Sequence, residues 1–238
     1  MRFSRTLLGF VLPVGIFMAT ALGLSGRYAL RTANAGAMPP QGSAASFPKD
    51  VYTDTGSRLP AIKREDLDDA GKKLFDSKTP PDAFGPGAIR LYSLPVAEHM
   101  AEVNSYLRNK SGLDERLVQM VILVTARESD SEYVWTAHEP QGLKAGLQPE
   151  IIDVIRYRKQ LNGLAEKDAV IIDLGRQVFE KHHVSSATAD RALELYGKQG
   201  LVNIVSLMGD YAATTVLLNA FDQHIRPTDK PLLPIPKK

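Results

Sequence analysis

The segment from Leu113 to Arg127 has apolar residues on nearly every side of a helix, and this pattern limits the fold more than any other. A surface helix has a single apolar stripe, whereas a helix that is apolar all round is buried. We therefore expect this segment at the centre of a helical core. Its apolar residues are Leu117, Val118, Met120, Val121, Ile122, Leu123 and Val124.

Helical patterns extend over most of the chain, while alternating β-branched runs beside hairpin turns are weak throughout. Pro95 predicts the first turn of a helix that ends near Asn109. Gly200 predicts the end of a helix that begins at Ser186. The long apolar helix that follows, 201–221, should be central or lie at a subunit interface. Further helices are expected over 64–75, 150–160 and 167–181. The fold class is therefore all-α.

The first 35 residues have the pattern of a secretory signal peptide. Arg2 and Arg5 precede an apolar run from Leu7 to Leu24, and Ala33-Asn34-Ala35 offers a small-x-small cleavage site. A retained membrane anchor is the alternative, because the run is nearly long enough to span a bilayer and basic residues follow it. Under either interpretation, we expect the folded part to be exported, as a periplasmic or secreted protein that touches the membrane only through this segment.

Composition divides the rest of the chain into three parts. Residues 36–60 are rich in Gly, Pro, Ser and Ala and predict a flexible spacer. Residues 61–226 form the expected helical domain, and 227–238 a Pro-rich, extended tail. The formal charge of +2 depends on four arginines in the first 35 positions. The remainder shows no basic patch, so we expect no nucleic-acid partner.

The sequence contains no cysteine, which excludes thiol redox catalysis and cysteine–metal sites. His182 and His183 are adjacent, so their side chains point about 100° apart on a helix and chelate poorly. We expect no metal and no cofactor. Any chemistry must come from oxygen and nitrogen side chains.

The segment 131–138 is the best candidate for a functional site. On a helix it places one polar, two apolar and one titratable side chain on a single face, and Tyr133 falls opposite. These four residues are Ser131, Val134, Trp135 and His138. Such a face could line a pocket or simply pack into a core.

Several stretches together resemble the carboxymuconolactone decarboxylase family, which includes the alkylhydroperoxidase D-like proteins. They are Leu113 to Leu123, Ala126-Arg127, the Glu132-Tyr133-x-Trp135-x-x-His138 core, Ala145-Gly146-Leu147, and the later stretch from Lys167 to Val202. The resemblance spans roughly 95–222. It implies an alkylhydroperoxidase D-like helical bundle that assembles into trimers or hexamers.

The peroxidase branch of this family uses two cysteines, a histidine and a glutamate. Those positions fall on Ser131, Val134, His138 and Gln119, so only the histidine is retained. Peroxidase activity through a cysteine pair is therefore excluded. The decarboxylase branch also lacks the pair, and this chain resembles it more closely.

The resemblance implies cofactor-independent decarboxylation, or related acid/base chemistry, on a small carboxylated lactone or ring compound. His138 could deliver a proton, because its ordinary pKa is near neutrality. Arg127 could bind the carboxylate, since its planar fork matches that group. Gln119 could donate a hydrogen bond, and Ser131 could supply a pocket hydroxyl. Trp135 and Tyr133 could line the substrate site.

Each of these residues also has a structural interpretation. His138 and Gln119 could join helices through hydrogen bonds, Arg127 could cap its helix or form a salt bridge, and Ser131 could start the next helix. Trp135 and Tyr133 could be core or interface aromatics. A non-catalytic oligomeric binding or scaffold protein is therefore the second hypothesis, and dehydratase or isomerase chemistry is a third.

Overall fold

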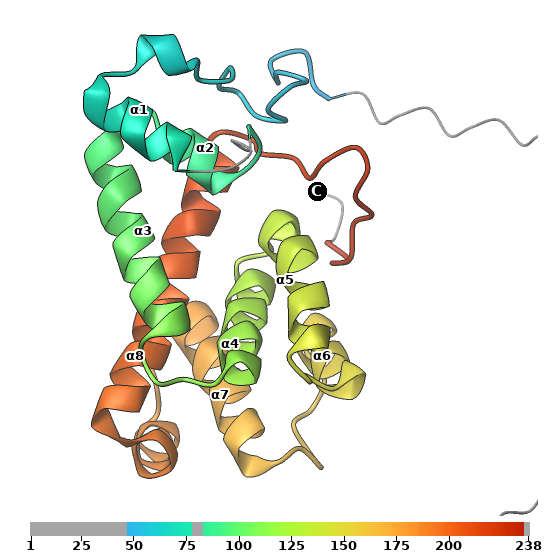
Figure 1. Ribbon diagram of the computed structural model, residues 1–238. Coiled ribbons are helices and arrows are strands. Elements are labelled where there is room, and N and C mark those ends of the chain that lie inside the picture. Colours follow the sequence, from blue (N-terminus) through green and yellow to red (C-terminus); the bar gives the residue numbers. More distant parts are fainter. Residues whose placement is uncertain (1–46, 78–82, 236–238) are drawn as a thin grey trace, which may run out of the picture. The chain divides into compact units, whose positions relative to one another are not determined.

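Helix α4 (Glu115–Glu128) lies at the centre of the computed structural model, which describes residues 47–77 and 83–235 (Figure 1). Every residue from Leu117 to Arg127 is buried, which confirms the expected central helix. Its most extensive contacts are with α5 (Glu132–Lys144), α7 (Glu166–Arg176) and α8 (Ser186–Ala220).

The remaining helices surround this centre, and α3 and α8 lie side by side (Figure 1). They are α1 (Asp69–Asp76), α2 (Pro86–Arg90), α3 (Leu94–Asn109) and α6 (Pro149–Arg156), with a 3-10 turn at Arg64–Asp66 and a π-helical turn at Gln177–Lys181. Within the described residues, extended pairing is limited to one antiparallel bridge between Tyr52 and Ser57. The all-α prediction is confirmed for this part of the chain.

Short polar side chains and prolines set the helix starts. The side chains of Asp114, Ser131 and Ser185 each accept a hydrogen bond from the backbone N–H three residues later. They satisfy donors that the first turns of α4, α5 and α8 would otherwise leave free. Prolines occupy the first turn of α2, α3 and α6, where the missing N–H is harmless.

Helix α8 is interrupted at Gly197, where φ is 67° and ψ is 171°. This conformation is accessible to glycine and strained for other residues. The expected break at Gly200 therefore lies three residues too far along the chain. Residues after Gly197 form the long apolar helix that packs against α3 and α4.

The described part of the expected spacer, 47–60, packs against the end of α8. The Gln223 side chain donates to the carbonyl of Thr55 at 2.9 Å, and the backbone N–H of His224 donates to the carbonyl of Gly56 at 2.8 Å. Val51 and Ser57 are buried. These contacts give this stretch a defined position although its composition is typical of a linker. The two ends of the described unit are therefore fastened to each other.

The expected extended tail is also held against the helices. Leu233 is buried, and the backbone N–H of Leu232 donates to the hydroxyl of Thr136 on α5. The expected signal or anchor, 1–35, and the rest of the spacer, 36–46, lie outside the described residues. Among the described helices, α8 is long and apolar enough to cross a membrane by length and composition, and half of its most apolar window is buried inside the protein.

Candidate functional site

A polar pocket of about 200 Å³ lies where α2, α3, α5 and α8 meet. His138 of α5 forms part of its wall, so the imidazole borders a hollow rather than a sealed hydrocarbon core. The other polar side chains that line the pocket are Arg90, Asn104, Arg108, Tyr133, Tyr211 and Thr214.

A chain of hydrogen bonds fixes the tautomer of His138. The Gln119 Nε2 donates to the carboxylate of Glu115 at 2.6 Å, and the Gln119 Oε1 lies 2.9 Å from His138 Nδ1. Because a carboxylate only accepts, the amide nitrogen faces Glu115 and the amide oxygen faces the imidazole. Nδ1 therefore carries the ring hydrogen, and Nε2 is the basic nitrogen of the neutral ring.

The His138 ring is uncharged at neutral pH. Burial lowers its pKa to about 3, and the positive charge of Arg108 contributes in the same direction. A neutral imidazole can accept a proton but holds none at Nε2 to donate. The neutral ring therefore suits the role of base or hydrogen-bond acceptor better than that of acid.

Two arginines give the pocket its positive character. Arg90 donates to the hydroxyl of Thr214 at 2.7 Å, and Arg108 donates to Oε1 of Gln141 at 3.3 Å. The Nε atom of Arg108 is buried and has no hydrogen-bond partner among the described residues. An anion with several acceptor oxygens could use these donors.

One carboxylate partly balances this charge. The side chain of Asn104 donates to Oδ2 of Asp210 at 2.7 Å, while Oδ1 of Asp210 is buried without a partner among the described residues. Burial lowers the pKa of Arg90, and Asp210 opposes this effect. Two guanidinium groups against one carboxylate leave a net positive site.

Tyr211 supplies a neutral donor beside the imidazole. Its ring meets that of His138 edge to face, with 5.1 Å between the ring centroids. Burial raises the pKa of Tyr211 above its ordinary value, so the phenol keeps its proton. The pocket thus joins cations, a neutral base and a protonated phenol, a set that suits proton transfer on a bound anion.

The structure brings together three of the six residues that the sequence singled out. His138 and Tyr133 line the pocket, and Gln119 lies behind His138. Tyr133 was expected on the face opposite His138, but the pocket spans both edges of α5. Ser131 and Trp135 are buried and do not line the pocket.

Ser131 and Trp135 have structural partners. The Ser131 hydroxyl accepts from the backbone N–H of Val134 and caps α5. The Trp135 indole donates to Glu139, and the guanidinium of Arg156 lies 5.6 Å from the Trp135 ring centroid. These contacts match the helix-start and core interpretations of the two residues.

Arg127 lies outside this pocket. Its guanidinium pairs with Asp130 at 2.8 Å and donates to the carbonyl of Pro234 at 3.1 Å, so it holds the C-terminal tail. The guanidinium groups that line the pocket belong to Arg90 and Arg108 instead. Arg127 is the last buried residue of α4, and its side chain reaches the tail rather than the pocket.

Five polar residues of the pocket were missed by sequence reasoning: Arg90, Asn104, Arg108, Tyr211 and Thr214. The spacing of four of them in the sequence is a weak indication that they act together. Asn104 and Arg108 are four residues apart on α3, and Tyr211 and Thr214 are three apart on α8, so each pair shares a helix face. The sequence alone does not show that these two faces meet α5.

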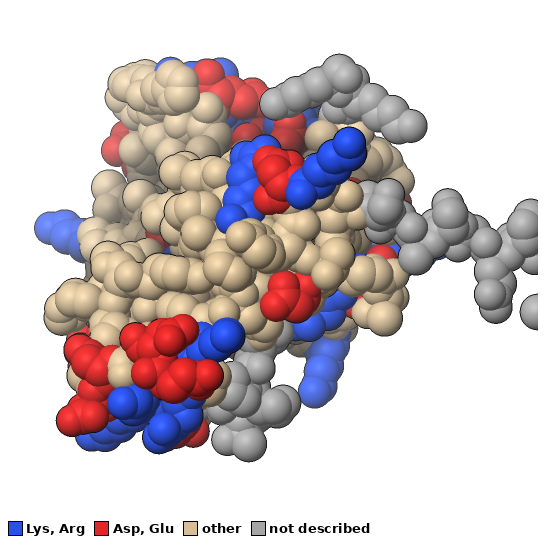
Figure 2. Space-filling model, turned by 90° about the horizontal axis from the view of Figure 1, so that it is seen from above, with Lys and Arg blue, Asp and Glu red and all other residues tan. Residues whose placement is uncertain are grey.

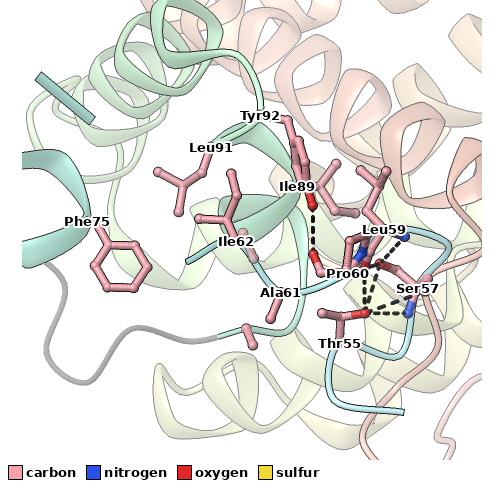
Figure 3. Close-up of a pocket in the computed structure, with 12 residues that line it drawn as sticks. Thr55, Ser57, Leu59, Pro60, Ala61, Ile62, Phe75, Ile89, Leu91 and Tyr92 are labelled. Atoms are coloured by element: carbon pink, nitrogen blue, oxygen red, sulfur yellow. Dashed lines mark hydrogen bonds between the residues drawn. The ribbon is translucent and has the colours of Figure 1, made fainter. Parts of the chain in front are cut away.

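A second pocket, of about 80 Å³, is mainly apolar. Figure 3 shows Ile62, Phe75 and Leu91 around it, with the hydroxyl of Tyr92 donating to the carbonyl of Pro60. Its lining contains no histidine, carboxylate, lysine or arginine. We assign the chemistry to the polar pocket, because it holds an imidazole beside two arginines.

Comparison with solved structures identifies the fold. A protein from Ralstonia eutropha JMP134, described as an alkylhydroperoxidase AhpD core and uncharacterized peroxidase-related protein, aligns with a TM-score of 0.58 and 15% identity, over 71% of this chain and 92% of that one. An uncharacterized peroxidase-related protein from Silicibacter sp. TM1040 aligns with the same TM-score and identity, over 73% and 93%.

No protein-family model and no curated protein matches the sequence. The structural matches nevertheless cover nearly the whole of both solved chains. The described helical unit therefore has the alkylhydroperoxidase D-like fold, in a chain without cysteine.

Proposed function

We propose that the polar pocket binds a small carboxylated ring compound and that His138 transfers a proton to or from it without a cofactor. The observation that carries this proposal is the meeting of Arg90 and Arg108 with a neutral imidazole in one pocket. The arginines would hold the carboxylate, and the imidazole would face the reacting ring.

Anion binding would prepare His138 for decarboxylation. A carboxylate within about 4–6 Å favours the protonated imidazole and raises its pKa. The fraction of rings that takes a proton from solvent would then be the reactive form. When the carbon–carbon bond to the carboxylate breaks, carbon dioxide leaves and the electron pair moves into the ring carbonyl. His138 would return its proton to carbon, while the Tyr211 phenol would donate a hydrogen bond to the enolate oxygen.

A neutral His138 also supports the first half of an isomerisation or dehydration. In that case the imidazole removes a proton from the carbon beside a carbonyl, and Tyr211 stabilises the same enolate. Both reactions need an anion site, an imidazole that transfers a proton and a hydrogen-bond donor to the enolate oxygen. They differ in whether carbon dioxide is released.

A non-catalytic binding protein is the second candidate. It is favoured by the engagement of Ser131 as a helix cap and by the amide of Gln119, which cannot supply a proton. In this case the pocket would hold the same anion without converting it.

The test separates the two candidates by measuring binding and turnover on the same protein. Carboxymuconolactone would be titrated calorimetrically and incubated for carbon dioxide release, with His138→Ala and Arg108→Gln as variants. Turnover abolished by His138→Ala, with binding retained, supports the enzyme. Binding without turnover supports the non-catalytic binding protein. Binding that is unaffected by Arg108→Gln contradicts both candidates.

The N-terminal segment bears on the compartment in which the protein acts. We propose that the helical unit works outside the cytoplasm, because residues 1–35 have a charged start, an apolar run and a cleavage pattern. Assembly as a homo-oligomer is proposed on the resemblance of the sequence to a family of trimers and hexamers. Separating cell fractions and sizing the purified protein would test these two points.

A further inference from the structure

The second half of α8 exposes an apolar stripe on the side away from the core. Val202, Val205 and Val216 are 63%, 40% and 69% exposed, and Gly209 and Ala213 between them are also exposed. The spacing of 202, 205, 209, 213 and 216 follows one face of a helix. At 1.5 Å per residue the stripe is about 21 Å long.

This stripe carries no charge. Between Gln199 and Ala220 the sequence has one charged residue, Asp210, and it is buried against the pocket side. In Figure 2 the charged side chains gather in clusters with broad uncharged areas between them. A partner for the α8 stripe must be similarly uncharged, because a charge buried there would have no counterion.

The stripe is also symmetric about Gly209. Val202 and Val216 are each seven residues from it, and Val205 and Ala213 are each four residues from it. Gln199 and Asn219, ten residues away on either side, are both exposed amides. Running the stripe against itself in the opposite direction pairs valine with valine, valine with alanine and amide with amide, while the exposed Ser206 meets the half-buried Ala212.

The centre of the stripe permits close approach. A Cβ atom added at Gly209 would meet nothing within 4 Å, so the space outside this residue is open. Glycine at a helix crossing lets two backbones come near each other and increases packing contact. The neighbouring helix α3 also has exposed apolar residues, Val96, Val103 and Tyr106.

We propose that this face binds a second copy of the chain across a two-fold axis at Gly209, with the two α8 helices antiparallel. A two-fold interface requires that if one residue contacts another, the reverse contact also forms. Because the stripe is nearly symmetric, most of these contacts would pair residues of similar size and polarity. The buried side of the same helical turns carries Tyr211 and Thr214 to the pocket, so dimer formation would brace that pocket wall from outside.

Single cysteines test the geometry directly, because the chain has none. In the full chain, Gly209→Cys should form a disulfide-linked dimer under mild oxidation, since both sulfurs lie at the axis. Val202→Cys alone should remain unlinked, because its own counterpart lies about 21 Å away. A mixture of Val202→Cys and Val216→Cys chains should cross-link to each other.

Charged variants test the same pairing without oxidation. Val202→Glu should weaken the dimer at least about tenfold, because two carboxylates would be buried against valines. Mixing Val202→Glu with Val216→Lys chains should restore association, as each mixed dimer pairs one carboxylate with one ammonium. Both positions are exposed, so the fold of the monomer should be unaffected, and circular dichroism would check this.

Three outcomes would overturn the proposal. Efficient self-linking of Val202→Cys would show parallel packing or random encounter. If the wild-type protein sedimented as a monomer and Gly209→Cys formed no disulfide-linked dimer, the α8 face would not bind a second copy. Protection of the stripe by lipid vesicles in place of a second copy would assign the face to a membrane.

Discussion

The Nδ1 atom of His138 lies 2.9 Å from Oε1 of Gln119, and this contact decides the chemical form of the imidazole. The amide is itself held by Glu115, so its oxygen has to face the ring. A glutamate at position 119 would act differently, because its negative charge would favour an imidazolium. The glutamine adds no charge, so burial keeps the ring neutral, and the contact leaves Nε2 as the unprotonated nitrogen.

Gln119→Glu should therefore raise the pKa of His138 from its value of about 3 by about 1–3 units. The introduced carboxylate would lie against Nδ1 and stabilise the protonated ring. Gln119→Met is the uncharged control and should leave the pKa low. Titration of the imidazole resonances by NMR would measure this, with His138→Gln used to assign the signal. Equal pKa values in all three proteins would refute the electrostatic account.

Acid should destabilise the wild-type protein more than His138→Gln. The unfolded chain takes up a proton at His138 near pH 6.5, whereas the folded protein does so only near pH 3. The free energy of unfolding therefore falls as pH decreases through this window, by at most about 1.4 kcal/mol per pH unit from this residue. The difference between wild type and variant in urea unfolding at several pH values isolates this contribution. If the free energies of unfolding of wild type and His138→Gln changed equally with pH, the predicted contribution of His138 would be wrong.

Arg90→Gln and Arg108→Gln should each weaken the binding of a carboxylated ring compound by about 10–100-fold, as expected for the loss of a charge-assisted hydrogen bond. Arg127→Gln is the matched control, because this arginine lies outside the pocket lining. It should leave affinity unchanged but lower the free energy of unfolding by about 1–3 kcal/mol, since the Pro234 carbonyl loses its donor. Calorimetry and thermal unfolding would measure the two effects. An affinity loss confined to Arg127→Gln would place the anion elsewhere.

Ser131→Ala should reduce stability by about 1 kcal/mol without changing ligand affinity. The hydroxyl caps α5 and does not line the pocket. Ser131→Asp preserves an acceptor at this position and should retain most of the stability. Chemical denaturation of the three proteins would test the order. If Ser131→Ala abolished binding at unchanged stability, the hydroxyl would belong to the site after all.

Gly175→Ala should destabilise the protein by about 1–3 kcal/mol through overpacking. A Cβ atom at this position would lie 2.2 Å from Cγ1 of Val124, where α7 crosses α4. Gly142→Ala is the matched substitution in α5, where the nearest atoms are 3.4 Å away. It should be neutral or stabilising by up to about 1 kcal/mol, because alanine favours the helix. Thermal unfolding of both variants checks the contrast.

Local patterns in the sequence predicted most of the helices. The all-round apolar pattern of α4 requires burial, and Pro95 marks the first turn of α3. The helix expected over 150–160 is shorter in the structure, ending at Arg156. Arg158 has a φ of 47°, which is incompatible with a continuing helix and which the sequence does not signal.

The candidate site was only partly accessible from the sequence. His138 and Gln119 could be found because they belong to one motif and lie on helices adjacent in sequence. Arg90 and Arg108 could not, because their position beside His138 depends on how α2 and α3 pack against α5 and α8. An arginine at position 127 could in principle bind an anion. Its side chain instead points to the C-terminal tail, where it donates to the carbonyl of Pro234.

The bonds that join Gln223 and His224 to the segment 55–56 close the helical unit into a loop. A cut or deletion just after α8 would release the opposite end of the unit as well. We expect amide hydrogen exchange in residues 51–59 and 221–224 to proceed at matching rates, since neither stretch can open while the other stays in place. Conversely, a short peptide linker could join the N-terminal and C-terminal ends of the unit. It would preserve the contacts of Gln223 and His224 with residues 55–56 and permit new termini at a loop elsewhere, such as the turn between α5 and α6.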